Sequence, residues 1–199
     1  MSDLSSFFPT NTEATIFQLV ITIWLLSEII GTAIIPRIRR GGSVIERKDR
    51  FSGLYIFATI FIALILSFYF AGAHIAMLPG WVFSLGILLI ILGIILRQLS
   101  MAILGKYFSG VVGIQKDQKV IEKGPYKYVR HPSYTGALMI FIGLGLALQS
   151  GAAVLTLIVL FIIAYGFRMY VEEKALISEL GEPYLDYKKR TKRLIPYVV

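Results

Sequence analysis

Residues 80–104 read GWVFSLGILLIILGIILRQLSMAIL, and a single charged residue, Arg97, interrupts this apolar run. A helix that crosses a bilayer needs about 20 mostly apolar residues, so the stretch predicts a membrane helix. Further apolar runs occupy residues 14–35, 54–73, 134–148 and 152–167, and we expect the last helix to extend to residue 172. We therefore expect an all-α integral membrane protein with five transmembrane helices.

The last two helices are joined only by the short turn at residues 149–151. At a rise of 1.5 Å per residue, about 15 apolar residues cover roughly 22 Å of a hydrocarbon core that is about 30 Å thick. We expect a tight helical hairpin that is either lengthened at its flanks or does not reach fully across the membrane.

The composition favours a membrane protein and excludes several kinds of site. Of the 199 residues, 56% are hydrophobic and 16% are charged, whereas soluble domains average about 45–50% and about 25%. The sequence has no cysteine, which excludes disulfides, thiolate zinc and a cysteine nucleophile. Two histidines, His74 and His131, are too few for a polyhistidine metal site. We expect one domain over residues 1–199 and no metal.

The 20 Lys and Arg residues predict the orientation in the membrane. Six lie in residues 36–50, six in residues 105–132 and seven from residue 168 onward, and Arg97 is near the same end of its helix. With five helices all of them lie on one side, so the positive-inside rule places the N-terminus outside and the C-terminus in the cytoplasm. Because anionic headgroups account for the charge, we expect the lipid bilayer as a partner and no nucleic acid.

Residues 105–133 and 168–199 are the sizeable polar segments, and we expect any water-soluble ligand to bind there. In the first, residues 124–126 predict a Gly-Pro turn. Residues 130–132 then lead into a helix whose first N–H groups are free to bind an anionic or carbonyl group. The alternative is that these basic and aromatic residues bind no ligand and form an interfacial aromatic belt together with a basic topology signal.

Arg168 and Glu172 are four residues apart, so they share one helix face, with Tyr165 one turn earlier. An arginine at the membrane boundary is suited to hold a carboxylate through two parallel hydrogen bonds. The alternative is an intrahelical Arg168–Glu172 ion pair that reaches toward the surface. Glu173 points elsewhere, and we expect it to be solvated.

Glu28 is a lone carboxylate in the middle of the first predicted helix, where a charge is costly and a functional role is the default hypothesis. The alternatives are a protonated carboxyl or an ion pair with Arg97. His74 lies at the end remote from the basic segments, and we expect it at the surface.

Two motifs, GPYKYVRHPSYTG at residues 124–136 and EEKALISELGEPYLDYKKRTKRLIP at residues 172–196, closely resemble the isoprenylcysteine carboxyl methyltransferase family. That family belongs to a wider group of membrane methyltransferases that includes phospholipid N-methyltransferases. The resemblance covers about residues 118–196. It implies methyl transfer from S-adenosylmethionine, which becomes S-adenosylhomocysteine, to the C-terminal carboxylate of a prenylated cysteine.

The resemblance also implies a cofactor pocket built from the connector 105–133 and the segment 168–199. Arg168 matches the arginine that binds the substrate carboxylate, and His131 is expected as a cofactor contact rather than a base. No motif before the connector carries over residues for a lipid pocket. The cofactor-binding residues implied are Gln118, Lys119, Val120, Ile121, Tyr126, His131, Pro132, Ser133, Tyr134 and Glu172.

This chemistry suits a membrane boundary, because a carboxylate already has the lone pair that attacks a sulfonium methyl group. Alignment and exclusion of water then matter more than a strong base. One alternative is a phospholipid or other lipid N-methyltransferase of the same superfamily, which would need a base and gain nothing from Arg168. The other is a transporter or sensor with Glu28 and Arg97 along its path. We expect the plasma membrane for a prokaryotic chain and the endoplasmic reticulum for a eukaryotic one.

Overall fold

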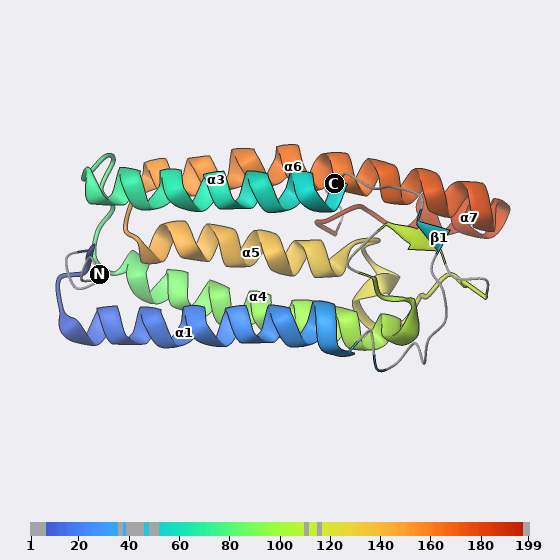
Figure 1. Cartoon of the computed structure of the whole chain (residues 1–199), viewed down its shortest axis with the longest axis horizontal. Coiled ribbons are helices and arrows are strands. Elements are labelled where there is room, and N and C mark those ends of the chain that lie inside the picture. The colour runs from blue at the N-terminus through green and yellow to red at the C-terminus, as the bar shows by residue number, and fades with distance from the viewer. Residues whose placement is uncertain are drawn as a thin grey trace.

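The protein, as described by a computed structural model at residues 7–35, 38, 46–47, 52–109, 112–114 and 117–196, is a bundle of long helices lying lengthwise (Figure 1). A two-stranded antiparallel sheet and one short helix lie beyond one end of the bundle. The long helices are α1 (Asn11–Ile29, continued by the π-helix η2, Ile30–Ile34), α3 (Ser52–Gly72), α4 (Val82–Leu104), α5 (Pro132–Ala147) and α6 (Gly151–Leu180). The smaller elements are β1 (Glu46–Arg47), η3 (Gly105–Tyr107), β2 (Gly113–Ile114), η4 (Gly124–Lys127) and α7 (Glu182–Arg190).

Four of the described helices are long and apolar enough to cross a membrane, at residues 11–34, 53–72, 82–107 and 151–180, and the chain is an integral membrane protein. The fifth predicted helix, α5, is apolar but has sixteen residues. The predicted end of the last helix at residue 172 is wrong, since α6 continues to Leu180. Residues 173–180 contain strong helix formers. The helix stops only at Gly181, whose φ of 59° and ψ of −133° are a backbone conformation that glycine adopts without strain.

Glycines bring α4 and α5 into close contact. A Cβ atom added at Gly93 would lie 2.6 Å from the carbonyl oxygen of Gly136, and one at Gly143 would lie 2.6 Å from that of Gly86. Only a residue without a side chain allows backbones to approach this closely. The close packing fixes the position of the start of α5 along the axis of α4.

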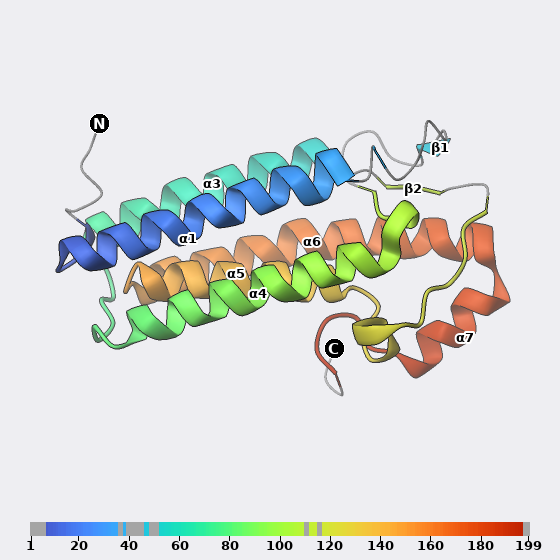
Figure 2. The same cartoon turned by 90° about the horizontal axis from the view of Figure 1, so that it is seen from below.

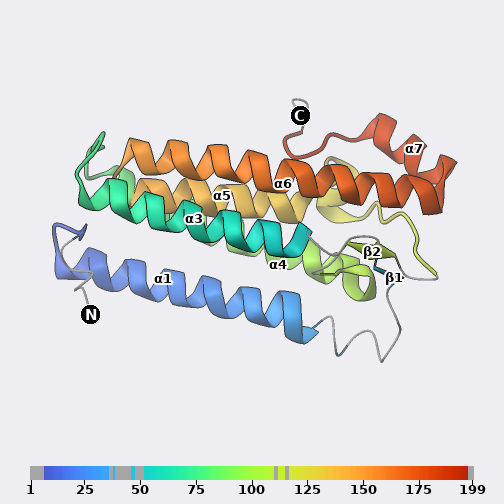
Figure 3. The same ribbon diagram turned by 45° about the horizontal axis from the view of Figure 1, so that its top comes forward.

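Helix α1 lies on the α4 side of the bundle, while α3 packs along α6 (Figures 1 and 3). The link from α1 to α4 is partly polar, because the Gln98 side chain donates to the Ser27 carbonyl oxygen at 3.0 Å. The π-helix follows directly, and its Gly31 is packed against the Gln98 and Met101 side chains. π-helical segments are rare in proteins, and those that occur are often found near functional sites.

The connector after α4, the two strands and α7 gather at the same end of the bundle (Figure 2). Lys and Arg residues of the described connector and C-terminal segment lie here, whereas residues 7–10, 73–81 and 148–150 at the opposite end contain neither. Six basic residues of the orientation argument lie outside the described residues, and for Arg47 only the backbone is described. These six are Arg37, Arg39, Arg40, Lys48, Arg50 and Lys116.

The chain after α7 folds back and pairs with the segment that precedes α5. Val129 and Lys192 form a parallel bridge, and the backbone N–H groups of Arg130 and His131 donate to the carbonyl oxygens of Lys192 and Arg193 at 2.7 and 3.0 Å. The Thr135 hydroxyl donates to the Leu194 carbonyl oxygen at 2.7 Å. The C-terminal segment therefore braces the start of α5.

Candidate active site

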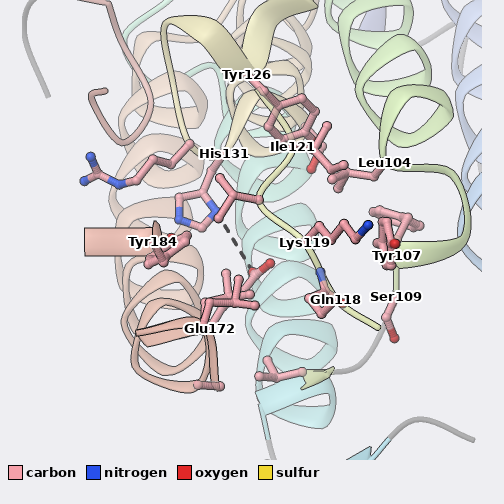
Figure 4. A pocket seen from close by; sticks show the side chains of 18 of the residues that line it. Leu104, Tyr107, Ser109, Gln118, Lys119, Ile121, Tyr126, His131, Glu172 and Tyr184 are labelled. Carbon is pink, nitrogen blue, oxygen red and sulfur yellow. Dashed lines mark ion pairs between the residues drawn. The ribbon is translucent and has the colours of Figure 1, made fainter. Parts of the chain in front are cut away.

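A cavity of about 890 Å³, counting the part open to solvent, lies where the connector crosses the ends of α5, α6 and α7. We call it the connector cavity, and Figure 4 shows its side chains converging from these elements. Arg168 and nine of the ten predicted cofactor residues line it: Gln118, Lys119, Val120, Ile121, Tyr126, His131, Ser133, Tyr134 and Glu172. Pro132 does not line it, because it is fully buried as the first residue of α5.

Arg168, Tyr134 and Glu172 form a hydrogen-bonded chain across α5 and α6. Arg168 Nε donates to the Tyr134 hydroxyl at 3.0 Å, and that hydroxyl donates to Glu172 Oε2 at 2.7 Å. Sequence spacing predicted that Arg168 and Glu172 share a face, but it gave no sign that a tyrosine from α5 would bridge them. Arg168 is 6% exposed and lines the connector cavity, so its charge lies against that cavity rather than in bulk water.

His131 is held on the same wall by two carboxylates and an aromatic ring. Its ring stacks on Tyr134 with centroids 5.3 Å apart and planes inclined by 11°. Nε2 lies 3.3 Å from Glu173 Oε1. Nδ1 lies 4.0 Å from Glu172 Oε2 (Figure 4). An imidazole fixed in this way can bind a polar ligand group in one orientation.

The prediction of a solvated Glu173 is wrong. Its side chain is 3% exposed and binds Arg130 Nε at 3.0 Å, Lys188 Nζ at 3.2 Å and Arg193 Nε at 3.2 Å, besides His131. The spacing along α6 did place it on a different face from Glu172. That face meets the returning C-terminal segment rather than water, and only the tertiary fold reveals this.

Buried tyrosines form a further wall, which sequence analysis identified only at Tyr126. Tyr184 and Tyr187 line the cavity from α7, where their spacing of three residues on a short helix was the available signal. The Tyr187 hydroxyl donates to the Tyr126 carbonyl oxygen at 2.8 Å. Burial raises the pKa of Tyr126, Tyr184 and Tyr187 above their usual value, so these hydroxyls remain protonated at neutral pH. They act as neutral walls and donors.

A second cavity, of about 700 Å³ including its open part, lies within the membrane bundle between α1 and α3. We call it the membrane cavity; α4, α5 and α6 form its back wall. Its lining is Trp24, Leu25, Glu28, Phe57, Ile60, Phe61, Leu64, Arg97, Ala137, Phe141 and Tyr165. Leu25, Phe57 and Phe61 are 50%, 69% and 56% exposed, so the cavity opens sideways toward lipid.

The charged residues of the membrane cavity are an ion pair. Arg97 binds Glu28 through Nε–Oε1 at 2.5 Å and Nη2–Oε2 at 2.8 Å. This arrangement agrees with the paired alternative for Glu28. Arg97 Nη1 also donates to the Ser133 carbonyl oxygen at 3.1 Å. The pair therefore connects α1 to the turn of α5 that faces the connector cavity.

Two tyrosines separate the cavities. Tyr165 lines the membrane cavity, Tyr134 lines the connector cavity, and their ring centroids are 5.0 Å apart. The two cavities are neighbours, and Arg168 lies one turn beyond Tyr165 on the connector side. A ligand with a water-soluble part and a ligand with an apolar tail can thus approach one another here.

Comparison with known proteins gives a consistent result. The model of the isoprenylcysteine carboxyl methyltransferase (ICMT) family matches residues 85–178, which begins earlier and ends sooner than the expected 118–196. Protein-S-isoprenylcysteine O-methyltransferase B of Arabidopsis thaliana is 28% identical over 158 residues, which are 76% of this chain and 80% of that protein.

Proteins named protein-S-isoprenylcysteine O-methyltransferase in Saccharomyces cerevisiae and Rattus norvegicus are 34% and 32% identical over 57% and 59% of this chain. The matches span 48% and 42% of these longer relatives. A solved structure of a eukaryotic intramembrane Ras methyltransferase superposes with a TM-score of 0.68 over 98% of this chain and 71% of that one. The two are 22% identical, and the likeness shows a shared fold.

Proposed function

We propose that the chain belongs to the isoprenylcysteine carboxyl methyltransferase family and that it transfers a methyl group from S-adenosylmethionine to the C-terminal carboxylate of a prenylated cysteine. The observation that carries the proposal is the position of Arg168. This buried cation lines the connector cavity one helical turn from Tyr165, which lines the lipid-facing membrane cavity. A carboxylate attached to an isoprenyl chain matches that combination of charge and apolar surface.

The connector cavity has the donor and acceptor groups that S-adenosylmethionine requires. Glu172 and the backbone of residues 118–121 are suited to its ammonium and hydroxyl groups, and Lys119, Arg130 and His131 to its carboxylate. Tyr126, Tyr184 and Tyr187 offer flat, neutral faces to the adenine. When bound, this cofactor supplies an electrophilic methyl group on a cationic sulfur.

Arg168 binds and orients the acceptor carboxylate, while the apolar side chains of the membrane cavity bind the isoprenyl chain. Its guanidinium neutralises the carboxylate enough for it to leave water. A carboxylate oxygen keeps a lone pair beyond its hydrogen bond to the arginine, and that lone pair can attack the methyl group. No proton has to be removed from a carboxylate. This is why Arg168 fits a carboxylate better than an amine acceptor, which would need a base.

The remaining contribution of the protein is positioning. The Tyr134 hydroxyl keeps Arg168 and Glu172 at fixed places, and Arg97 fixes the Ser133 carbonyl oxygen at the start of α5. Such groups hold the acceptor in line with the donor and exclude water, and both effects favour methyl transfer.

We further propose that α5 is a fifth crossing, with the N-terminus outside and the basic end of the bundle in the cytoplasm. The clustering of described Lys and Arg residues at one end supports this orientation. The water-soluble donor then reaches the connector cavity from the cytoplasm and the acceptor reaches Arg168 from the membrane.

The test is binding of S-adenosylmethionine by calorimetry, followed by transfer of labelled methyl to a farnesylated cysteine analogue in detergent or vesicles. We expect saturable binding and a base-labile methyl ester. If the protein binds S-adenosylmethionine, forms no ester and methylates an amine headgroup, the acceptor is an amine lipid rather than a prenylated cysteine. Absence of S-adenosylmethionine binding would refute the enzymatic proposal.

A further inference from the structure

The membrane cavity has one polar end and one closed apolar end. At the polar end, Glu28 and Arg97 lie near the start of α5. At the other end the Trp24 ring meets Phe141 edge to face, with centroids 6.2 Å apart. Trp24 and Phe141 are 9% and 4% exposed, so they form a solid wall between α1 and α5.

Beyond this wall the space between α1 and α3 is filled by more aromatic rings, which we call the aromatic plug. Its contacts are Phe8 with Phe17 at 4.9 Å, Phe17 with Phe68 at 6.4 Å and Phe7 with Phe68 at 5.7 Å between centroids. None of these phenylalanines lines the cavity. The lining that α1 contributes to the membrane cavity therefore ends at Trp24.

The direction of an amphiphile in this cavity follows from these two ends. The polar end lies beside Tyr165 and hence toward Arg168, and the chain directions of α1, α3 and α5 place Trp24, Leu64 and Phe141 farther from the connector cavity. A prenylated cysteine bound by Arg168 points the free end of its chain toward Trp24. The lining of α3 from Phe57 to Leu64 covers about 10 Å along the axis at 1.5 Å per residue.

We propose that Trp24, supported by Phe141, is the residue that limits the length of the isoprenyl chain of the acceptor. The inference rests on the proposed function and adds a specificity determinant to it. A chain that reaches the wall fills the cavity, whereas each further isoprene unit has to bend out toward lipid or displace buried rings. Packed aromatic interiors resist such added volume.

The experiment compares S-prenylated cysteine analogues with two, three and four isoprene units and measures kcat/KM for each. Trp24→Ala removes the wall and is expected to raise the ratio of longest to shortest acceptor by at least about tenfold, since single methylenes in apolar pockets already discriminate by that factor. Leu64→Trp fills the cavity from α3 and is expected to shift the ratio the opposite way. Trp24→Leu is the milder variant should Trp24→Ala fold poorly.

The matched control is Phe17→Ala, because Phe17 lies on the same helix, is 2% exposed and does not line the cavity. The ratio should be unchanged in this variant. If Trp24 and Phe17 variants methylate acceptors with the wild-type ratio, the length limit is refuted while the proposed function stands. If the wild-type protein binds S-adenosylmethionine but methylates none of the three acceptors, the function itself is refuted and the inference falls with it.

Discussion

Arg168 on α6 donates a hydrogen bond to the hydroxyl of Tyr134 on α5 at 3.0 Å, and the same hydroxyl donates to Glu172. One hydroxyl thereby fixes two groups with different proposed roles. Tyr134→Phe is expected to weaken S-adenosylmethionine binding by about tenfold, the usual cost of one hydrogen bond to a charged group. Calorimetry without acceptor measures this directly.

Tyr165→Phe serves as the control for Tyr134→Phe, because Tyr165 is equally buried and lies on the membrane side of the pair. Its cofactor affinity should match that of the wild type. Equal losses in both variants would mean that the effect comes from repacking of the two rings.

Arg168→Ala is expected to lower kcat/KM for the prenylated acceptor by at least about a hundredfold, the scale of a buried charged contact with substrate. Cofactor affinity should change far less, because the cofactor is assigned to Glu172 and the connector. Lys174→Ala, on an exposed position of the same helix, is the control. A parallel loss of cofactor binding and turnover would contradict the assignment of Arg168 to the acceptor.

Glu28→Gln leaves Arg97 with a buried charge and without its carboxylate partner, and we expect a loss of about 3–5 kcal/mol in stability. The double variant Glu28→Met/Arg97→Met should recover most of it, since apolar replacement of a buried ion pair is often neutral. The free energy of unfolding, measured in mild detergent, compares the single variant with the double variant. A stable Glu28→Gln protein without activity would instead make Glu28 a catalytic group.

Glu173→Gln removes the charge that holds Arg130, Lys188 and Arg193 together. The C-terminal segment should then detach more often, so limited trypsin digestion should cleave it at least several-fold faster, and S-adenosylmethionine should slow the cleavage. Glu179→Gln, at an exposed site two turns later on α6, is the comparison. An unchanged rate of cleavage would show that the backbone pairing alone retains the segment.

Tyr184 is buried, and its hydroxyl has no hydrogen-bond partner in the described part of the chain. Burial, followed by the charges of Glu173 and Glu172, raises its pKa above the ordinary value of about 10. Because the pKa of Tyr184 is higher in the folded than in the unfolded protein, the contribution of this side chain to stability is complete below about pH 10. It is lost as the pH rises further, since the hydroxyl then ionises more readily in the unfolded protein. Tyr184→Phe should unfold less readily than the wild type above that pH and show little change at pH 7.

Apolar runs and their lengths predicted every long helix of the described chain to within a few residues, except for the end of α6. The HPSY run at residues 131–134 and the pair Arg168 and Glu172 were also predicted to share a site. The structure brings all of them except Pro132 to one cavity. Their roles there stay predictions.

Contacts between distant segments were beyond the sequence. The Tyr134 bridge depends on the register of α5 against α6, and the burial of Glu173 depends on a C-terminal segment that folds back. The membrane cavity arises because α1 packs on α4 while α3 packs on α6. Each of these is a property of helix packing, and no local pattern encodes it.

The strand-like pairing of residues 128–131 with residues 191–193 has a consequence for biosynthesis. Domains fold as the chain emerges from the ribosome, N-terminal part first. All five long helices precede residue 191, so they can insert while the wall around His131 is still incomplete. Pairing of residues 191–193 with the start of α5 is thus a later event than synthesis of the long helices, and it completes the wall around His131.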